Sequence, residues 1–297
     1  MNRSLTPKQV AQAIGVSEAS LKRWCDQGLV PTVRTAGGHR RLPLEGVIQY
    51  LRSSGRALEK PEVLGLPSLT GQGDALMSRA SESLQSALES GDDDVFRRHV
   101  LNLYLSGKSA CEISDQALTP AMRGIGERWE HGIVNVYQER RACEMCARVL
   151  NELRALLPTL PDSAPLAIGG TLAGDQYLIA TRIAELVLRE SGWNAQNLGS
   201  NLPGESVCAA IKTVKPRLVW LSVSHIADAA AFLREYELVC KAAKAARVTI
   251  AIGGNALDAT IRERMHYTAF CETFAHLISF AGSLKKVPSA KRVPSAE

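Results

Sequence analysis

A glycine turn that carries cationic side chains is the part of this sequence with the clearest chemistry. Gly37 and Gly38 stand side by side, and glycine tolerates the positive φ that a tight hairpin turn requires. The cations on or beside the turn are Arg34, His39, Arg40 and Arg41. Cations held in this way meet phosphates, so the sequence predicts a nucleic-acid contact here.

Positive charge is concentrated around this turn. The chain of 297 residues carries a net charge of +5. Residues 1–56 hold nine lysines and arginines against three acidic residues, a net charge of +6, so the remaining residues sum to about −1. The basic excess therefore belongs to the N-terminal segment, where a polyanion would bind.

Two short helices and a hairpin are the elements expected to position these cations. Thr6 opens the first helix as a capping residue, and Ser17 caps the second. The spacing of apolar residues in the second helix leaves Lys22 and Arg23 on its outer face. This is a helix-turn-helix arrangement with its second helix presented to the major groove, and residues 33–42 form the adjoining hairpin, or wing.

The segment closely resembles the winged-helix domain of the MerR family, in particular the branch that responds to light and cobalamin. The matched residues are Lys22-Arg23-Trp24, Gly28-Leu29-Val30-Pro31, Arg34-Thr35 and Gly38-His39-Arg40-Arg41. The resemblance implies that residues 1–56 bind double-stranded DNA and that the chain regulates transcription as a repressor. Lys22 and Arg23 would enter or flank the major groove, while the cations of the wing hold phosphates.

The middle of the chain is expected to form a linker and then a helical bundle. Residues 57–74 are rich in glycine and proline and lack the long heptad helix through which many MerR-type proteins dimerise. Residues 75–158 carry four apolar stripes at helical spacing with breaks near glycines, which predicts a four-helix bundle.

Strands and helices alternate over residues 162–284. Strands are expected at 166–169, 193–198, 218–223 and 248–252, and helices at 177–189, 205–214, 227–246 and 270–284. This alternation predicts a Rossmann-like parallel α/β domain, so the whole chain is a multidomain α and α/β protein. Ligands of such domains bind beyond the carboxyl ends of the strands.

The loops at those strand ends resemble the cobalamin-binding signature of B12-binding modules. Its three motifs fall on Asp175-Gln176-Tyr177, Ser222-Val223-Ser224 and Gly253-Gly254. The first motif spans residues 175–180, so 41 residues separate it from the second, and 28 residues separate the second from the third. The resemblance implies that these residues surround a cobalamin.

The helical segment resembles the bundle that caps the corrin ring in the same modules. By that resemblance Trp129 would cover the upper face of the corrin. Glu139 and Arg140 stand where a Glu-His pair flanks the upper ligand in the family.

Some residues of this signature differ from those of the family, at positions that contact the axial ligands in family members. Tyr177 replaces the histidine that ligates cobalt, Ala180 replaces a glycine, and Ser224 replaces a leucine. A neutral imidazole offers a nitrogen lone pair, whereas a phenol with a pKa of about 10 is a poor donor to cobalt. Asp175, which orients the histidine in the family, has no histidine to orient at position 177.

Three interpretations of the C-terminal half stay open. It binds a cobalamin such as adenosylcobalamin without a histidine at position 177, or it holds another tetrapyrrole in the same cleft. Alternatively it holds no ligand and serves to oligomerise or to bind a regulatory protein partner. The leading hypothesis is a repressor whose C-terminal module controls a homo-oligomer, dimer or tetramer, in a light or cobalamin response. The alternative is a cobalamin-independent regulator, or an anti-repressor that acts through a protein partner.

Other sequence features set the class of protein. A corrinoid-dependent enzyme would need the missing histidine and a catalytic partner domain, so no enzymatic activity is expected. Seven scattered cysteines, including the pair Cys143 and Cys146, fit packing in a reducing compartment better than disulfides or a metal site. No segment approaches the roughly 18 apolar residues of a membrane span, so we expect a cytoplasmic protein that contacts no membrane. Residues 285–297 are expected to form a disordered basic tail.

Overall fold

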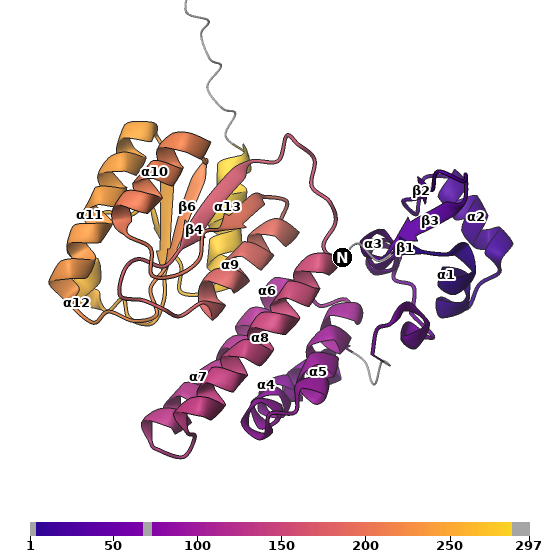
Figure 1. Ribbon diagram of the computed structural model, residues 1–297, viewed down its shortest axis with the longest axis horizontal. Coiled ribbons are helices and arrows are strands. Elements are labelled where there is room, and N and C mark those ends of the chain that lie inside the picture. The colour runs from indigo at the N-terminus through magenta and orange to yellow at the C-terminus, as the bar shows by residue number, and fades with distance from the viewer. Residues whose placement is uncertain (1–3, 68–72, 287–297) are drawn as a thin grey trace, which may run out of the picture. The chain divides into compact units, whose positions relative to one another are not determined.

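The computed structural model describes residues 4–67 and 73–286 and divides the chain into two compact units, residues 1–159 and 160–297 (Figure 1). The first unit holds a small winged-helix domain and a helical bundle, and the second is an α/β domain. Each unit has its own core. The fold class expected from the sequence is confirmed.

The winged-helix domain is built on three short antiparallel strands in the order β1-β3-β2. Its elements are β1 (Ser4–Leu5), α1 (Pro7–Ala13), α2 (Glu18–Asp26), β2 (Val33–Arg34), β3 (Arg40–Pro43) and α3 (Leu44–Ser54). Val33 pairs with Arg41 and Arg34 with Arg40, which forms the predicted wing. The strand β1 was not expected from the sequence, because two residues carry no periodicity.

Local side chains determine where the first two helices begin. The hydroxyl of Thr6 accepts from the backbone N–H of Gln9, and the Gln9 side chain accepts from the Thr6 N–H, which completes a capping box. Ser17 caps α2 by accepting from the N–H of Ser20. Gly38 adopts a φ of +77° at the tip of the wing, a conformation that favours glycine.

The segment after α3 is partly folded onto the winged-helix domain. A 3₁₀ helix, η1 (Pro61–Leu64), packs against α1, and the backbone N–H groups of Glu59 and Lys60 both donate to the carbonyl of Ala13 at 2.9 Å. The apolar side chains Leu58, Leu64 and Leu66 are buried there. Residues 58–66, expected to lie in a linker, are therefore folded in the structure and bury their leucine side chains.

The rest of the first unit is a bundle with four helical segments. They are α4 (Gly73–Ser90), α5 (Asp93–Leu105), a third segment that runs through α6 (Ala110–Ile113), the π-helical η2 (Ser114–Leu118) and α7 (Thr119–Glu130), and finally α8 (Val136–Leu156). The apolar stripes predicted from the sequence meet in its core, where Leu84, Leu88, Phe96, Ile113 and Ile125 are almost fully buried.

The second unit is a five-stranded parallel sheet in the order β5-β4-β6-β7-β8. Its elements are β4 (Leu166–Gly170), α9 (Ile179–Glu190), β5 (Asn194–Asn197), α10 (Gly204–Val214), β6 (Leu218–Ser222), α11 (Ala229–Ala246), β7 (Thr249–Gly253), α12 (Ala259–Arg262), β8 (Ala269–Phe270) and α13 (Phe274–Lys286). Helices α10 and α11 cover one face, and α9 and α13 cover the other (Figure 1).

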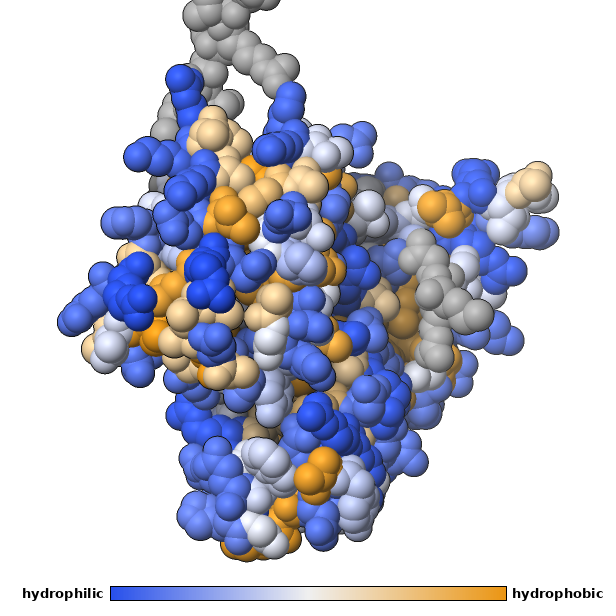
Figure 2. Space-filling view, turned by 60° about the vertical axis from the view of Figure 1, so that its left-hand side comes forward, coloured by the Kyte–Doolittle hydropathy of each residue, from blue (hydrophilic) through white to orange (hydrophobic). Residues whose placement is uncertain are grey.

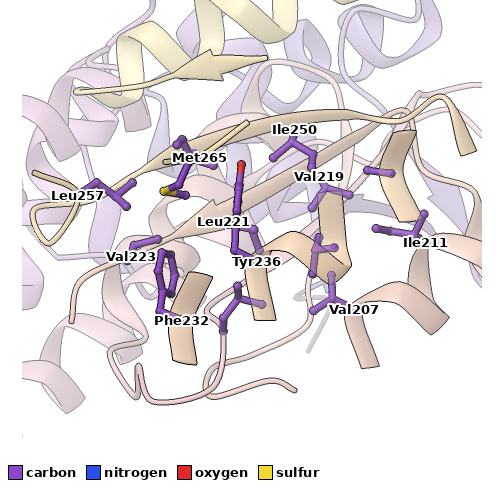
Figure 3. Packing of buried hydrophobic residues seen from close by; sticks show 14 of the residues in the cluster. Val207, Ile211, Val219, Leu221, Val223, Phe232, Tyr236, Ile250, Leu257 and Met265 are labelled. Carbon is purple, nitrogen blue, oxygen red and sulfur yellow. The ribbon is translucent and has the colours of Figure 1, made fainter. Parts of the chain in front are cut away.

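A hydrophobic core lies between the sheet and helices α10 and α11 (Figure 3). Val219, Leu221 and Val223 point to this face because alternate residues of a strand share one side. Trp220 points to the opposite face, where its indole N–H donates to the hydroxyl of Thr181 on α9 at 3.0 Å.

The C-terminal end of this unit differs from the sequence expectation. The helix expected at 270–284 begins only at Phe274, because Phe270 belongs to the edge strand β8. Lys285, expected to open a disordered tail, lies within the last turn of α13 and donates through its ammonium group to the carbonyl of Ser191. Residues 287–297 of the expected tail lie outside the described residues.

Candidate functional site

The outer face of α2 and the wing carry the cations predicted to contact DNA. Lys22 and Arg23 are exposed on α2, and Arg34 and His39 are exposed on the wing. Lys22 has one ion-pair partner, Glu18, at 3.9 Å on the same helix, and exposed pairs of this kind hold a side chain only weakly. Arg41 is half-buried beside them. The structure therefore brings the predicted cations to neighbouring elements of one domain.

Arg40 differs from the other cations because it is held by the protein itself. Its guanidinium donates to Oδ1 of Asp26 and to the carbonyl of Lys22, at 2.5 and 3.1 Å. Both acceptors lie on α2, so Arg40 braces β3 of the wing against the last turn of that helix. Sequence reasoning placed Arg40 among the phosphate contacts and did not foresee this pairing with a residue 14 positions away.

Thr35 closes the wing rather than presenting its hydroxyl outward. Its hydroxyl accepts from the N–H of His39 at 3.2 Å, and its own N–H donates to the His39 carbonyl at 2.9 Å. The N–H of Gly38 donates to the Thr35 carbonyl at 2.8 Å. These bonds define the loop on which His39 is exposed.

The turn between α7 and α8 exposes several apolar side chains. Trp129 is 40% exposed, while Ile133, Val136 and Tyr137 are between 57% and 66% exposed. Figure 2 shows apolar surface at its lower end, the end at which α7 and α8 meet. Apolar side chains gathered on a surface are typical of interaction sites.

Glu139 and Arg140 lie at the start of α8 as an ion pair. Their side chains approach to 3.4 Å, and the side chain of Glu139 is 13% exposed whereas that of Arg140 is 60% exposed. The thiol of Cys143 donates to the Glu139 carboxylate at 3.2 Å. Burial, assisted by the charge of Glu139, raises the pKa of the Cys143 thiol to about 12. In the part of the chain that the structure describes, no group of three or more His, Cys, Asp or Glu side chains could hold a metal ion.

In the α/β unit, Asp175 ties together the loops that follow β4 and β6. Its side chain is buried, with 3% of its surface exposed. Oδ1 accepts from the N–H of Tyr177 at 3.0 Å, and Oδ2 accepts from the N–H groups of Ser224 and His225 at 2.6 and 3.2 Å. Burial raises the pKa of Asp175, and the three backbone hydrogen bonds oppose that shift. Asp175, expected to orient nothing, orients two backbone loops.

Tyr177 and His225 are neighbours at this edge of the sheet. Their ring centroids lie 6.3 Å apart, and the ring planes are tilted by 56°. Tyr177 is half-buried and His225 is exposed. No site residue was predicted at position 225 from the sequence. The place of His225 directly after Ser222-Val223-Ser224 was the available signal that it follows a strand of the site.

The remaining predicted residues lie at the ends of β6 and β7. Ser222 ends β6 and is 8% exposed. A Cβ at Gly253 would lie 2.5 Å from the carbonyl oxygen of Cys271. Gly254 has a φ of +129°, and a Cβ there would lie 2.1 Å from the carbonyl oxygen of Val223. The glycine pair is thus required by close backbone packing, which fixes the loops after three neighbouring strands.

Comparison with known families identifies both halves of this arrangement. A helix-turn-helix domain model matches residues 4–55, and a B12 binding domain model matches residues 80–154. The chain joins a helix-turn-helix domain to a B12 binding domain. These matches confirm the resemblance drawn from the wing and from the helical bundle, and the three loop motifs lie outside both matched segments.

Individual relatives agree with this combination. The HTH-type transcriptional repressor CarH of Myxococcus xanthus is 31% identical over 128 residues, which make up 41% of this chain and 40% of that protein. The dimethylamine corrinoid protein 2 of Methanosarcina acetivorans is 21% identical over 175 residues, 58% of this chain and 81% of that protein. The chain therefore spans well under half the length of the repressor that it matches.

A solved structure shares the fold of much of this chain. The monomethylamine corrinoid protein of Methanosarcina barkeri superposes with a TM-score of 0.58 at 17% identity, over 70% of this chain and 99% of that one. Among the helices of the described residues, none has the length and apolar character needed to cross a membrane.

Proposed function

We propose that this chain is a DNA-binding transcriptional repressor whose B12 binding domain controls its oligomeric state. The observation that carries the proposal is the exposure of Lys22 and Arg23 on α2 beside a cationic wing, within a helix-turn-helix domain. A helix and a wing with exposed cations can contact the bases and phosphates of one DNA site. The similarity to a named transcriptional repressor supports the same role.

The cations of α2 and those of the wing are proposed to contact different parts of the DNA. Lys22 and Arg23 project from the helix that would enter the major groove, so they would read or flank base edges. Arg34, His39 and Arg41 would contact phosphates. These contacts release counterions, so the affinity for DNA falls steeply as salt is added.

The loops of the α/β domain fit a corrinoid when their donor groups are considered together. Gly174 and Gly199 have positive φ values, and an added Cβ at either would meet no atom within 4 Å, so space is open over the loops after β4 and β5. Ser222, Gly253 and Gly254 would hold the ligand from the ends of β6 and β7. The imidazole of His225 supplies a donor that the phenol of Tyr177 does not.

The helical bundle contributes apolar contacts to the same function. Trp129 would cover a face of the corrin, and Glu139 and Arg140 would flank it with charge. A bound cobalamin would supply a metal centre that can exchange a ligand. The exposed apolar turn between α7 and α8 supports the oligomerisation that we propose, since such surface gains free energy when it is covered.

Two linked measurements test this function on the full chain. Fluorescence anisotropy with DNA from the region upstream of its own coding sequence should show binding that weakens with salt. Sedimentation velocity in darkness should show a larger species after adenosylcobalamin is added, and illumination should reverse the change. Absence of DNA binding at low salt would overturn the proposal. DNA binding with no effect of adenosylcobalamin would overturn the ligand control and favour the cobalamin-independent regulator.

A further inference from the structure

We propose that His225 is the protein's axial nitrogen ligand to a bound corrinoid. The inference rests on the proposed function, namely that the chain holds a corrinoid at the loops of its α/β domain. It assigns the donor to the loop after β6, whereas the family signature places it in the loop after β4 at the position of Tyr177.

The position of the imidazole is the first observation. The loops after β4 and β6 lie side by side, because these two strands are neighbours and parallel in the sheet. The rings of Tyr177 and His225 reach the same place from the two loops, with centroids 6.3 Å apart. The loop after β4 has no histidine at position 177, and the imidazole of His225 on the adjacent loop after β6 can take its place as the nitrogen donor.

The backbone beneath His225 is held in place while its ring stays accessible. The buried carboxylate of Asp175 accepts from the N–H of His225 at 3.2 Å and from the preceding N–H, of Ser224, at 2.6 Å. The side chain of His225 is exposed. A fixed backbone below an accessible ring is what a preorganised ligand position requires.

The chemistry of the available donors is the second observation. Neutral imidazole is the commonest nitrogen ligand of transition metals in proteins, and a phenol keeps its proton at neutral pH. The other histidines are His39, His99, His131, His266 and His276. None of these lies in a loop that follows the carboxyl end of a strand of the parallel sheet. His276 lies in the first turn of α13, the helix after β8, so His225 is the one histidine in a loop at the carboxyl edge of the parallel sheet.

Electron paramagnetic resonance of the full-length protein loaded with cob(II)alamin tests the assignment directly. A coordinated nitrogen splits the cobalt lines into triplets, and nitrogen-15 converts them to doublets. With nitrogen-15 histidine in the protein and an unlabelled corrinoid, we expect doublets for the unaltered chain. We expect loss of the protein-derived splitting for His225→Ala and His225→Gln, and doublets again for the control Tyr177→Phe.

The outcomes separate this inference from the proposed function. Triplets that ignore the histidine label would show that the corrinoid's own base is the ligand, and doublets that persist in both His225 variants would point to another histidine. Either result overturns the assignment while corrinoid binding stands. Failure of the unaltered protein to retain cob(II)alamin on gel filtration would overturn the proposed ligand, and this inference with it. Unchanged circular dichroism of the variants, whose altered side chain is exposed, shows that they are folded.

Discussion

Arg40 on the wing and Asp26 at the end of α2 form an ion pair that joins the two elements proposed to contact DNA. The side chain of Arg40 is 22% exposed and that of Asp26 is 63% exposed. The second hydrogen bond of Arg40, to the carbonyl of Lys22, adds geometric definition to the pair. We infer that Arg40 sets the distance between the helix and the wing and does not itself hold a phosphate.

This relationship predicts different salt behaviour for two arginines of the wing. Arg34→Ala removes a phosphate contact, so the slope of log affinity against log salt should fall by about 1. Arg40→Ala should weaken binding with little change of that slope. Salt titrations of DNA binding measure both. An equal loss of slope in the two variants would contradict the role of Arg40 as a brace.

Asp26→Ala is the matched control for the same pair. If only the electrostatic repulsion between Asp26 and DNA matters, its removal should raise the affinity for DNA. If the ion pair with Arg40 positions the wing, loss of that pair should lower the affinity. We expect weaker binding by Asp26→Ala, and tighter binding would show that the ion pair does not position the wing.

The buried carboxyl group of Asp175 should lose its proton at a higher pH than the exposed carboxyl group of Asp228 in the same domain. Burial raises the pKa of Asp175 above the ordinary value of 3.8, whereas backbone hydrogen bonds at the start of α11 lower that of Asp228. The carbon-13 chemical shifts of the two labelled carboxyl groups, followed against pH, should therefore show the midpoint of Asp175 above that of Asp228. The reverse order would contradict the burial of Asp175.

The same shift gives stability a definite dependence on pH. Since the folded state holds this proton more tightly than the unfolded chain, the contribution of Asp175 is fully present below its unfolded pKa. The contribution is lost as the pH rises through the folded pKa. Other carboxyl groups titrate in the same acid range, so the difference in urea-unfolding free energy between the unaltered protein and Asp175→Asn, followed against pH, should show this contribution.

Two glycines of the α/β domain should respond in opposite directions to substitution by alanine. Gly254 combines a φ of +129° with a carbonyl oxygen 2.1 Å from an added Cβ, so Gly254→Ala should cost about 1–3 kcal/mol or more. Gly282 lies within α13 with no atom within 4 Å of an added Cβ, so Gly282→Ala should stabilise by about 1 kcal/mol. Hydrogen exchange of the β6 and β7 amides measures both. An unchanged free energy of unfolding in Gly254→Ala would show that the loops can move apart without destabilising the domain.

The thiol of Cys143 should be poorly reactive although it is one half of a C-x-x-C pair. Its pKa of about 12 leaves almost no thiolate near neutral pH, and the thiolate is the nucleophile. Alkylation by iodoacetamide, read by mass spectrometry at this position, should be slow. Glu139→Gln should accelerate it, because the charge of Glu139 and its hydrogen bond both raise the thiol pKa. No acceleration would assign the shift to burial alone.

Features set by neighbouring residues were predictable from the sequence. The caps at Thr6 and Ser17 and the glycine turn of the wing depend on contacts within four residues, and the structure shows them as expected. The parallel sheet followed from the alternation of strands and helices. The edge strand β8 was missed because a pair of residues has no period, and Phe270 was instead assigned to a helix.

Contacts between distant residues could not be predicted in the same way. Arg40 meets Asp26, and Asp175 meets Ser224 and His225 some 50 positions away, only once the chain has folded. The motif spacing located the loops correctly. It did not show which side chains of adjacent loops become neighbours, so the pairing of Tyr177 with His225 needed the structure.

The packing of η1 on α1 decides where the DNA-binding domain can be excised. A fragment that stops at residue 56 would lose the two hydrogen bonds to Ala13 and would strip Leu58, Leu64 and Leu66 from the apolar side of α1. Such a fragment would expose the apolar side of α1 to solvent and aggregate. Its weak DNA binding would then result from the truncation and not from the DNA-binding residues. An isolated DNA-binding domain that folds by itself therefore has to include the residues up to Leu66.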